Sequence, residues 1–133
     1  DPVEIMFTGY TDLIDVNVPI MLVNPRKWNV AWGGFAMEPN PHFATGVLGA
    51  LKVRGLTKST PVVLMCRSGG TPAAKTLEGL GLEAVYVVVD GFEGTTDRDN
   101  PNGPWRTIDG WKNSGLPWSY KLNPKKVYIR EIE

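Results

Sequence analysis

The chain has 133 residues, of which 42% are hydrophobic, and this suits one globular domain with a single core. Fourteen basic and fourteen acidic residues give a formal net charge of zero, which argues against broad electrostatic binding to nucleic acid or to an anionic membrane. One cysteine and one histidine exclude an internal disulfide and a Cys/His zinc cluster, and no apolar stretch approaches the roughly 20 residues of a membrane span.

The first third of the chain is expected to hold short elements followed by a longer helix. Alternation of β-branched and polar residues indicates strands, whereas glycines and prolines indicate a loop. Apolar residues at helical spacing, introduced by Asn40 and Pro41, predict an amphipathic helix. The expected elements are a helical turn at 4–7 ending at Gly9, strand segments at 13–18 and 20–23, a loop over 24–41 and a helix over 42–56.

The remainder alternates between apolar runs and helical patterns. The near-continuous apolar run at 84–89 is typical of a central parallel strand covered on both faces. Strands separated by helices predict an α/β fold, a sandwich with a mainly parallel central sheet flanked by helices. The expected elements are a strand at 61–65, a helix at 72–80 closed by Gly81, the strand at 84–89, a surface loop at 95–103, a short helix at 108–113 and a strand at 126–132.

Cys66 is the most informative residue, because it stands where a strand ends and a glycine-rich loop begins. Thr71 is a good N-cap and Pro72 suits the first helical position, so the loop opens onto a helix N-terminus. Free N–H groups and the helix dipole favour an anion there, and hence the nucleophilic thiolate. A lone cysteine is often only a small buried hydrophobe. The glycines and the arginine of the loop favour a functional cysteine.

The loop and its surroundings resemble the rhodanese-like sulfurtransferase family. The core of the resemblance is the segment 62–70, Val-Val-Leu-Met-Cys-Arg-Ser-Gly-Gly, which is similar to the single-domain rhodanese active-site loop. Four further segments resemble the family in the same order along the chain: 4–9 (Glu-Ile-Met-Phe-Thr-Gly), 40–43 (Asn-Pro-His-Phe), 84–94 (through Asp-Gly-Phe-Glu-Gly) and 110–118 (with Gly-Leu-Pro).

The resemblance implies a rhodanese-like three-layer sandwich and a sulfurtransferase that needs no cofactor. Cys66 would accept a sulfane sulfur from thiosulfate, polysulfide or a persulfide and pass it to cyanide, a thiol or a protein acceptor. Backbone N–H groups would surround the terminal sulfur, and the Arg67 guanidinium would attract an anionic donor. The expected substrate-binding residues are Arg67, Ser68, Gly69, Gly70 and Thr71.

Three departures from the family pattern matter. Thr71 stands where many active members carry Arg or Lys, and Tyr10 stands where the family usually has His. The chain begins just after the point where the family's Asp-x-Arg strand should end. We therefore expect residues 1–133 to form a single domain that lacks the family's first strand, with the segment 126–132 as the candidate to fill its place.

The loop also invites two interpretations other than an active sulfurtransferase. A phosphatase or arsenate reductase would need an arginine six positions after Cys66, and that position is Pro72. A catalytically weak sulfur carrier, redox sensor or docking module remains open, because Thr71 replaces the cation. One free thiol in a soluble domain suits either cytoplasm or periplasm, so the compartment is also open.

Several other polar and aromatic residues are interpreted as structural. His42 is expected at the surface of a helix start rather than as a base. Asp90 and Glu93 are expected to serve a turn. The five tryptophans are expected to anchor core and loops, and two of them, Trp28 and Trp32, are also candidates to wall one side of the pocket.

Overall fold

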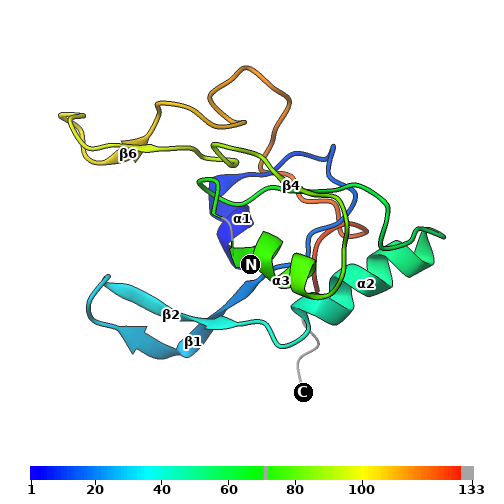
Figure 1. Ribbon diagram of the computed structural model, residues 1–133. Helices are drawn as coiled ribbons and strands as arrows, with labels where there is room; N and C mark the ends of the chain where they lie inside the picture. Colours follow the sequence, from blue (N-terminus) through cyan, green and yellow to red (C-terminus); the bar gives the residue numbers. More distant parts are fainter. Residues whose placement is uncertain (71, 130–133) are drawn as a thin grey trace. The chain divides into compact units, whose positions relative to one another are not determined.

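The computed structural model describes residues 1–70 and 72–129, which form three helices and six strands (Figure 1). This mixture of helix and strand fits the α/β class predicted from the sequence. By its internal contacts the chain divides into two compact units: Asp1–Ala50 with the segment from Ser119 onward, and Leu51–Trp118. The single domain expected from the sequence stays a prediction.

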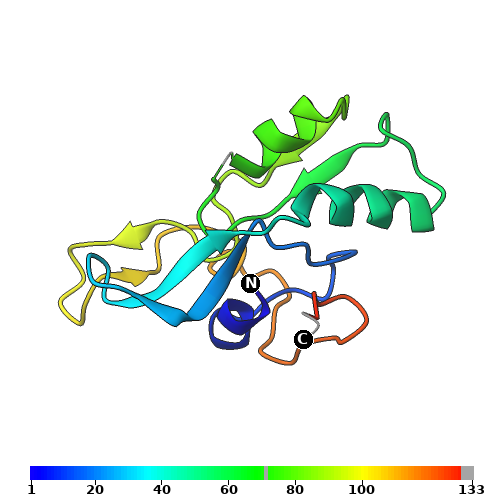
Figure 2. The ribbon, with the colours of Figure 1, turned by 90° about the horizontal axis from the view of Figure 1, so that it is seen from below.

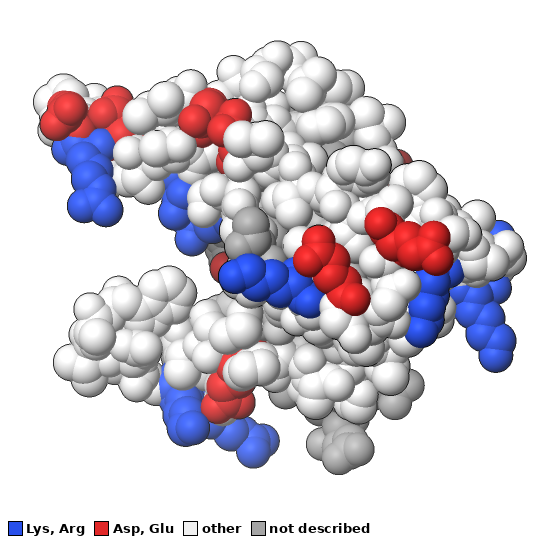
Figure 3. Space-filling view, viewed as in Figure 1, with Lys and Arg blue, Asp and Glu red and all other residues white. Residues whose placement is uncertain are grey.

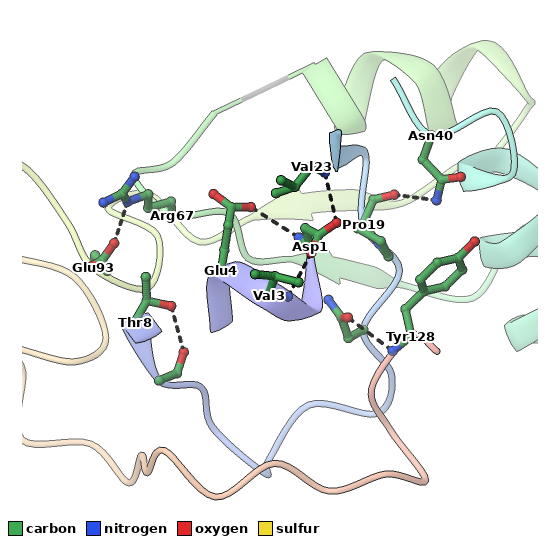
Figure 4. Close-up of polar contacts among 12 residues, drawn as sticks. Asp1, Val3, Glu4, Thr8, Pro19, Val23, Asn40, Arg67, Glu93 and Tyr128 are labelled. Atoms are coloured by element: carbon green, nitrogen blue, oxygen red, sulfur yellow. Dashed lines mark hydrogen bonds and ion pairs between the residues drawn. The ribbon is translucent and has the colours of Figure 1, made fainter. Parts of the chain in front are cut away.

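The first unit opens with helix α1, Pro2–Thr8. The Asp1 carboxylate accepts a hydrogen bond from the Val3 N–H at 2.8 Å, and Glu4 completes a capping box with Asp1 (Figure 4). Gly9 ends the helix with a φ of +85°. The short helix expected before Gly9 is confirmed, and it is longer than the predicted turn because Asp1 caps it and Pro2 suits its first position.

Strands β1, Met21–Asn29, and β2, Gly34–Pro39, form an antiparallel hairpin. The loop expected over 24–41 is therefore wrong. The register shifts between Asn24 and Trp28, around a proline that has no N–H to donate, so the irregular part of the ladder accommodates it. The Trp28 and Phe35 rings meet edge to face with centroids 5.6 Å apart.

The strand expected over 13–18 is also wrong, since these residues form turns and irregular backbone. Their polar groups bond to the later segment instead of to a ladder: the Asn17 N–H donates to the Lys126 carbonyl at 2.7 Å, and the Tyr128 N–H donates to the Asn17 side chain at 3.2 Å. The strand expected over 126–132 is absent from 126–129, and residues 130–132 lie outside the described part of the chain.

Helix α2, Phe43–Val53, confirms the helix expected over 42–56. It begins as the sequence predicts, because the Asn40 side chain accepts a hydrogen bond from the His42 N–H at 3.0 Å. Phe43 and Val47 are buried. His42 is exposed, in agreement with the expectation of a surface residue.

The second unit contains the parallel strands β3, Val62–Leu64, and β4, Val85–Val87, and helix α3, Pro72–Gly79, which contacts β4 (Figure 2). These three elements confirm the strands and helix expected around the cysteine. The helix buries the apolar face predicted by its spacing; its buried residues are Ala73, Ala74 and Leu77.

The expected mainly parallel central sheet is wrong for the described residues. Among the strand pairs of this part of the chain, β3–β4 is parallel, whereas β1–β2 is antiparallel, as is the pair of β5, Thr96–Asp97, with β6, Trp105–Arg106. The last pair lies in and just beyond the expected surface loop. The expected helix at 108–113 is also wrong, since these residues form turns.

The expectation that the strand at 84–89 is covered on both faces is wrong too. Val63 and Tyr86 are cross-strand partners on one face of the β3–β4 pair, and their side chains are 65% and 58% exposed. The residues that flank them on both strands face the other way and are half-buried. The apolar run therefore forms a pair of strands with one covered face.

No helix within 1–70 or 72–129 is long and apolar enough to cross a membrane. On the face drawn in Figure 3, acidic and basic side chains are interspersed, and neither sign gathers into a broad patch.

Candidate functional site

The loop of residues 66–70 leaves the carboxyl end of β3 and leads toward α3. Strand pairing continues one residue past β4, because the Val88 N–H donates to the carbonyl of Leu64, the last residue of β3, at 2.9 Å. Cys66 follows the strand by two residues, so the thiol stands beyond the carboxyl end of a parallel strand, as the sequence predicted. This end of a parallel pair is where α/β folds place their ligands.

The turn at 91–94, which follows β4, holds the loop through its backbone. The Phe92 N–H donates to the Cys66 carbonyl at 2.7 Å. The Glu93 and Gly94 N–H groups both donate to the Arg67 carbonyl, at 2.9 and 3.1 Å. Because two successive carbonyls of the loop are fixed in this way, the position of the thiol depends on the turn after the neighbouring strand.

Two glycines allow the backbones of loop and turn to touch. Gly91 has a φ of +68°, and a Cβ there would lie 2.5 Å from the Cys66 carbonyl oxygen and 2.6 Å from the Ser68 nitrogen. Gly69 has a φ of +83°, and its Cβ would lie 1.8 Å from the Val89 carbonyl oxygen. Both the positive φ and the close backbone contacts disfavour any other residue at these positions.

The Cys66 thiol is half-buried, and its Sγ donates to the Gly70 carbonyl at 3.4 Å. Burial raises the pKa of the Cys66 thiol above its ordinary value of 9.0, and a backbone hydrogen bond at Gly70 lowers this pKa by a smaller amount. This direction is opposite to the sequence-based expectation that the helix N-terminus favours the thiolate. Desolvation of the thiol outweighs this hydrogen bond, so the net direction of the pKa shift is upward.

Arg67 is tied to Glu93 rather than left in solvent. Its Nε–H donates to the Glu93 carboxylate in an ion pair (Figure 4). The Glu93 side chain is 15% exposed and the Arg67 side chain 50% exposed, so the carboxylate is the more buried partner. The sequence placed Glu93 in a structural turn and missed this pair, because the two residues are 26 positions apart. The usable signal was that each follows one of two adjacent apolar strands.

The other expected site residues occupy the rest of the loop. Ser68 is exposed, and within 1–70 and 72–129 no side-chain hydrogen bond of Ser68 is formed. Gly70 supplies the carbonyl that accepts from the thiol. Thr71, expected both as helix N-cap and as a substrate-binding residue, lies outside the described residues.

A further layer of polar contacts supports the turn, and sequence reasoning did not find it. The Trp111 and Lys112 N–H groups donate to the Gly91 and Phe92 carbonyls at 3.0 and 2.9 Å. The Asn113 side-chain amide contacts three carbonyl oxygens at 2.8 to 3.2 Å; they belong to Glu93, Arg106 and Asp109. The loop, the turn after β4 and the segment 106–113 therefore form successive layers joined mainly by backbone carbonyls.

Two contacts of the Trp118 ring join the turn after β4 and the segment that packs on it. The Phe92 and Trp118 rings meet edge to face with centroids 6.4 Å apart, and the Lys112 ammonium lies 4.3 Å from the centre of the Trp118 ring. The Trp111 indole donates to the Pro117 carbonyl at 2.8 Å. These tryptophans anchor a loop, as the sequence predicted, whereas Trp28 and Trp32 are mostly exposed in and beside the hairpin.

No family model matches the chain, and no curated protein matches it. In the described part of the chain, no three His, Cys, Asp or Glu side chains gather in a way that would hold a metal ion. The loop itself offers one thiol, the Gly70 carbonyl in contact with it, and one guanidinium paired with a carboxylate.

Proposed function

We propose that the chain is a rhodanese-like sulfurtransferase, with a rhodanese-like sandwich as its fold, and that it carries sulfur as a persulfide on Cys66. The observation that supports this most directly is the placement of the thiol. Cys66 lies beyond the end of a parallel strand, in a loop whose carbonyls are fixed by the turn after the neighbouring strand. A loop fixed in this way keeps the sulfur at one position while donor and acceptor are exchanged.

The reaction has two displacement steps. The Cys66 thiolate attacks the outer sulfur of thiosulfate; a new S–S bond forms, the S–S bond of thiosulfate breaks, and sulfite leaves with the bonding electron pair. Cyanide, or a thiolate, then attacks the outer sulfur of the Cys66 persulfide. Thiocyanate or a new persulfide forms, and the Cys66 thiolate is restored. The proton of the resting thiol goes to solvent before the first step.

Polysulfide and small persulfides are donors by the same chemistry, with a thiolate or a shorter polysulfide as leaving group. The neutral resting thiol reacts with these donors more slowly than an ionised thiol would, because only the thiolate attacks. A donor that reaches Sγ would displace the Gly70 carbonyl, which the thiol contacts at 3.4 Å in the free protein. The loop residues Arg67 to Gly70 would then surround the bound donor.

Intact-protein mass spectrometry tests this proposal. Wild-type protein incubated with thiosulfate, and separately with polysulfide or glutathione persulfide, should gain one sulfur atom and lose it after cyanide is added. Cys66→Ser should gain none under any condition. A Ser68→Ala variant is the matched control, since it changes a neighbouring hydroxyl and leaves the thiol. No gain of sulfur by the wild type with any donor would refute the proposal.

A sulfur carrier or docking module is the second candidate, and it is favoured by Thr71, which stands where many active members of the family carry a cation. A carrier accepts sulfur from a partner protein and does not turn over with small donors. Transfer to Cys66 from a persulfidated protein, without any reaction with thiosulfate or polysulfide, would support this candidate over the enzyme.

A further inference from the structure

We infer that Glu93 sets the charge of the sulfur donor that the site prefers, by compensating Arg67, so that the site selects weakly charged persulfide or thiosulfonate donors over the thiosulfate dianion. This inference rests on the proposed function. It deepens that function by naming the donor class, and it makes Glu93 a positioning residue that acts through Arg67.

The first observation is the charge of the loop itself. Arg67 is the one charged residue among positions 66–72, so any electrostatic attraction that the loop's side chains exert on an anionic donor comes from this guanidinium. A fixed cation beside the thiol would favour thiosulfate, which carries two negative charges, over donors that carry one. The selectivity of the loop therefore depends on how far the Arg67 charge is offset by its neighbours.

The second observation is the ion pair. The Glu93 carboxylate accepts from the Arg67 Nε–H, and it is the more buried of the two side chains. The backbone reinforces the pair, because the Glu93 N–H donates to the Arg67 carbonyl at 2.9 Å. Two contacts therefore join the same two residues, one between their side chains and one between their backbones.

The third observation is the charge of the bracing turn. The segment from Asp90 to Gly94 carries two carboxylates, Asp90 and Glu93, and no cation. With Arg106, whose guanidinium donates to the Gly94 carbonyl at 2.6 Å, the loop and the turn hold two positive and two negative groups. Coulomb energy scales with the charge of the donor, so compensation of Arg67 removes twice as much attraction from a dianion as from a monoanion, and the dianion meets twice the repulsion from each carboxylate.

The test compares two donors that react alike but differ in charge. Thiosulfate is a dianion that releases sulfite, and benzenethiosulfonate is a monoanion that releases benzenesulfinate; in both, the Cys66 thiolate takes the outer sulfur and the sulfur–sulfur bond breaks. Values of kcat and KM are measured for each donor, with cyanide as acceptor, for wild type, Glu93→Gln and Arg67→Gln, and for the variant carrying both changes.

Glu93→Gln keeps the shape and the backbone contacts of the turn and removes the negative charge beside Arg67. We expect kcat/KM for thiosulfate to rise about fivefold, the upper end of the range for a partly exposed charge pair. For the monoanion the expected rise is about twofold, since half the charge gives half the interaction energy. The change should appear in KM rather than in kcat. In the Arg67→Gln background, Glu93→Gln should raise kcat/KM for thiosulfate by a smaller factor than it does in the wild-type background.

Glu78→Gln is the matched control, because it removes the same charge from an exposed position on α3. Glu78→Gln should leave the ratio of the kcat/KM values for the two donors unchanged. Raising the ionic strength from about 0.01 M to about 0.15 M, which shortens the screening length from roughly 30 Å to 8 Å, should reduce the effect of Glu93→Gln.

An equal change for both donors, no change for either, or an undiminished effect in the Arg67→Gln background overturns the inference while the sulfurtransferase function stands. If the wild type gains no sulfur from either donor, the proposed function and the inference fail together. Should Glu93→Gln fail to fold, the salt dependence of kcat/KM in the wild type still tests the inference. A compensated site predicts that kcat/KM for thiosulfate changes less than about twofold over the same salt range, and a steeper fall overturns the inference.

Discussion

Replacement of Gly91 by alanine tests the packing of the Cys66 loop against the turn after β4. Gly91 has a φ of +68°, and a Cβ there would meet the Cys66 carbonyl oxygen at 2.5 Å. Gly55 has almost the same φ, +67°, but nothing lies within 4 Å of its Cβ position. The pair of variants Gly91→Ala and Gly55→Ala therefore separates the cost of the backbone conformation from the cost of the steric contact.

The expected magnitudes follow from these two contributions. A positive φ costs an alanine about 1–2 kcal/mol, and the reduced entropy of the unfolded chain offsets about 0.4–1 kcal/mol of it. Gly55→Ala should thus lower the free energy of unfolding by about 1 kcal/mol. Gly91→Ala adds the displacement of the loop backbone, about 1–3 kcal/mol as for other overpacked sites, and should lower it by about 2–4 kcal/mol.

Urea unfolding followed by tryptophan fluorescence measures both values, with the midpoint expected to change and the slope to stay constant. The sulfur gained by Cys66 from thiosulfate is measured on the same samples. Gly91→Ala should slow this reaction, because the carbonyl it displaces belongs to Cys66 itself, whereas Gly55→Ala should leave its rate unchanged. Equal losses of stability in the two variants would refute the reasoning, since the contact with the loop would then contribute nothing.

The remaining predictions concern single side chains. Alkylation of Cys66 by iodoacetamide should rise through a midpoint above pH 9.0, because burial raises the pKa of the thiol; a midpoint below that value contradicts the geometry. The pKa of Asp12 is lowered from 3.8, chiefly by hydrogen bonds from Asn123 and Tyr10. These bonds stabilise the folded state above pH 3.8, and this stabilisation is lost as the pH falls through the lower pKa of the folded state. Asp12→Asn should therefore be less stable than the wild type at pH 5–7 and equal to it in strong acid, as measured by thermal unfolding; a constant difference across this range would contradict the assignment. Asn113→Ala should lower the free energy of unfolding by about 1 kcal/mol in urea titrations and slow sulfur uptake by Cys66, because three carbonyls lose their donor; an unchanged midpoint would show that water replaces the amide without cost.

Local sequence patterns predicted the elements that carry the candidate site. Helix α2 follows from apolar spacing and from its Asn40 cap, and α3 follows from apolar spacing and from Pro72 at its first position. Strands β3 and β4 follow from short apolar runs. The position of Cys66 at the end of β3 follows from the same runs. These features depend on interactions between residues close in sequence, so the sequence was sufficient to find them.

Local patterns failed where the outcome depended on a partner elsewhere in the chain. The alternating residues 13–18 have strand character but form no ladder, because their polar groups bond to the segment around Lys126. The residues 24–39 contain prolines and glycines and nevertheless form a hairpin, because the proline falls where the register shifts. A strand exists only when another strand satisfies its N–H and C=O groups, and no local pattern specifies that partner.

The candidate nucleophile, Cys66, and the cation next to it in the chain, Arg67, could thus be read from the sequence. Their chemistry was decided by the tertiary structure. Parallel pairing of β3 with β4 brings Glu93 to Arg67, although the two residues are 26 positions apart in the chain. Burial raises the pKa of the Cys66 thiol, whereas the helix N-terminus was expected to lower it. The charge and ionisation of these groups are set by neighbours and desolvation, and both arise only once distant segments pack together.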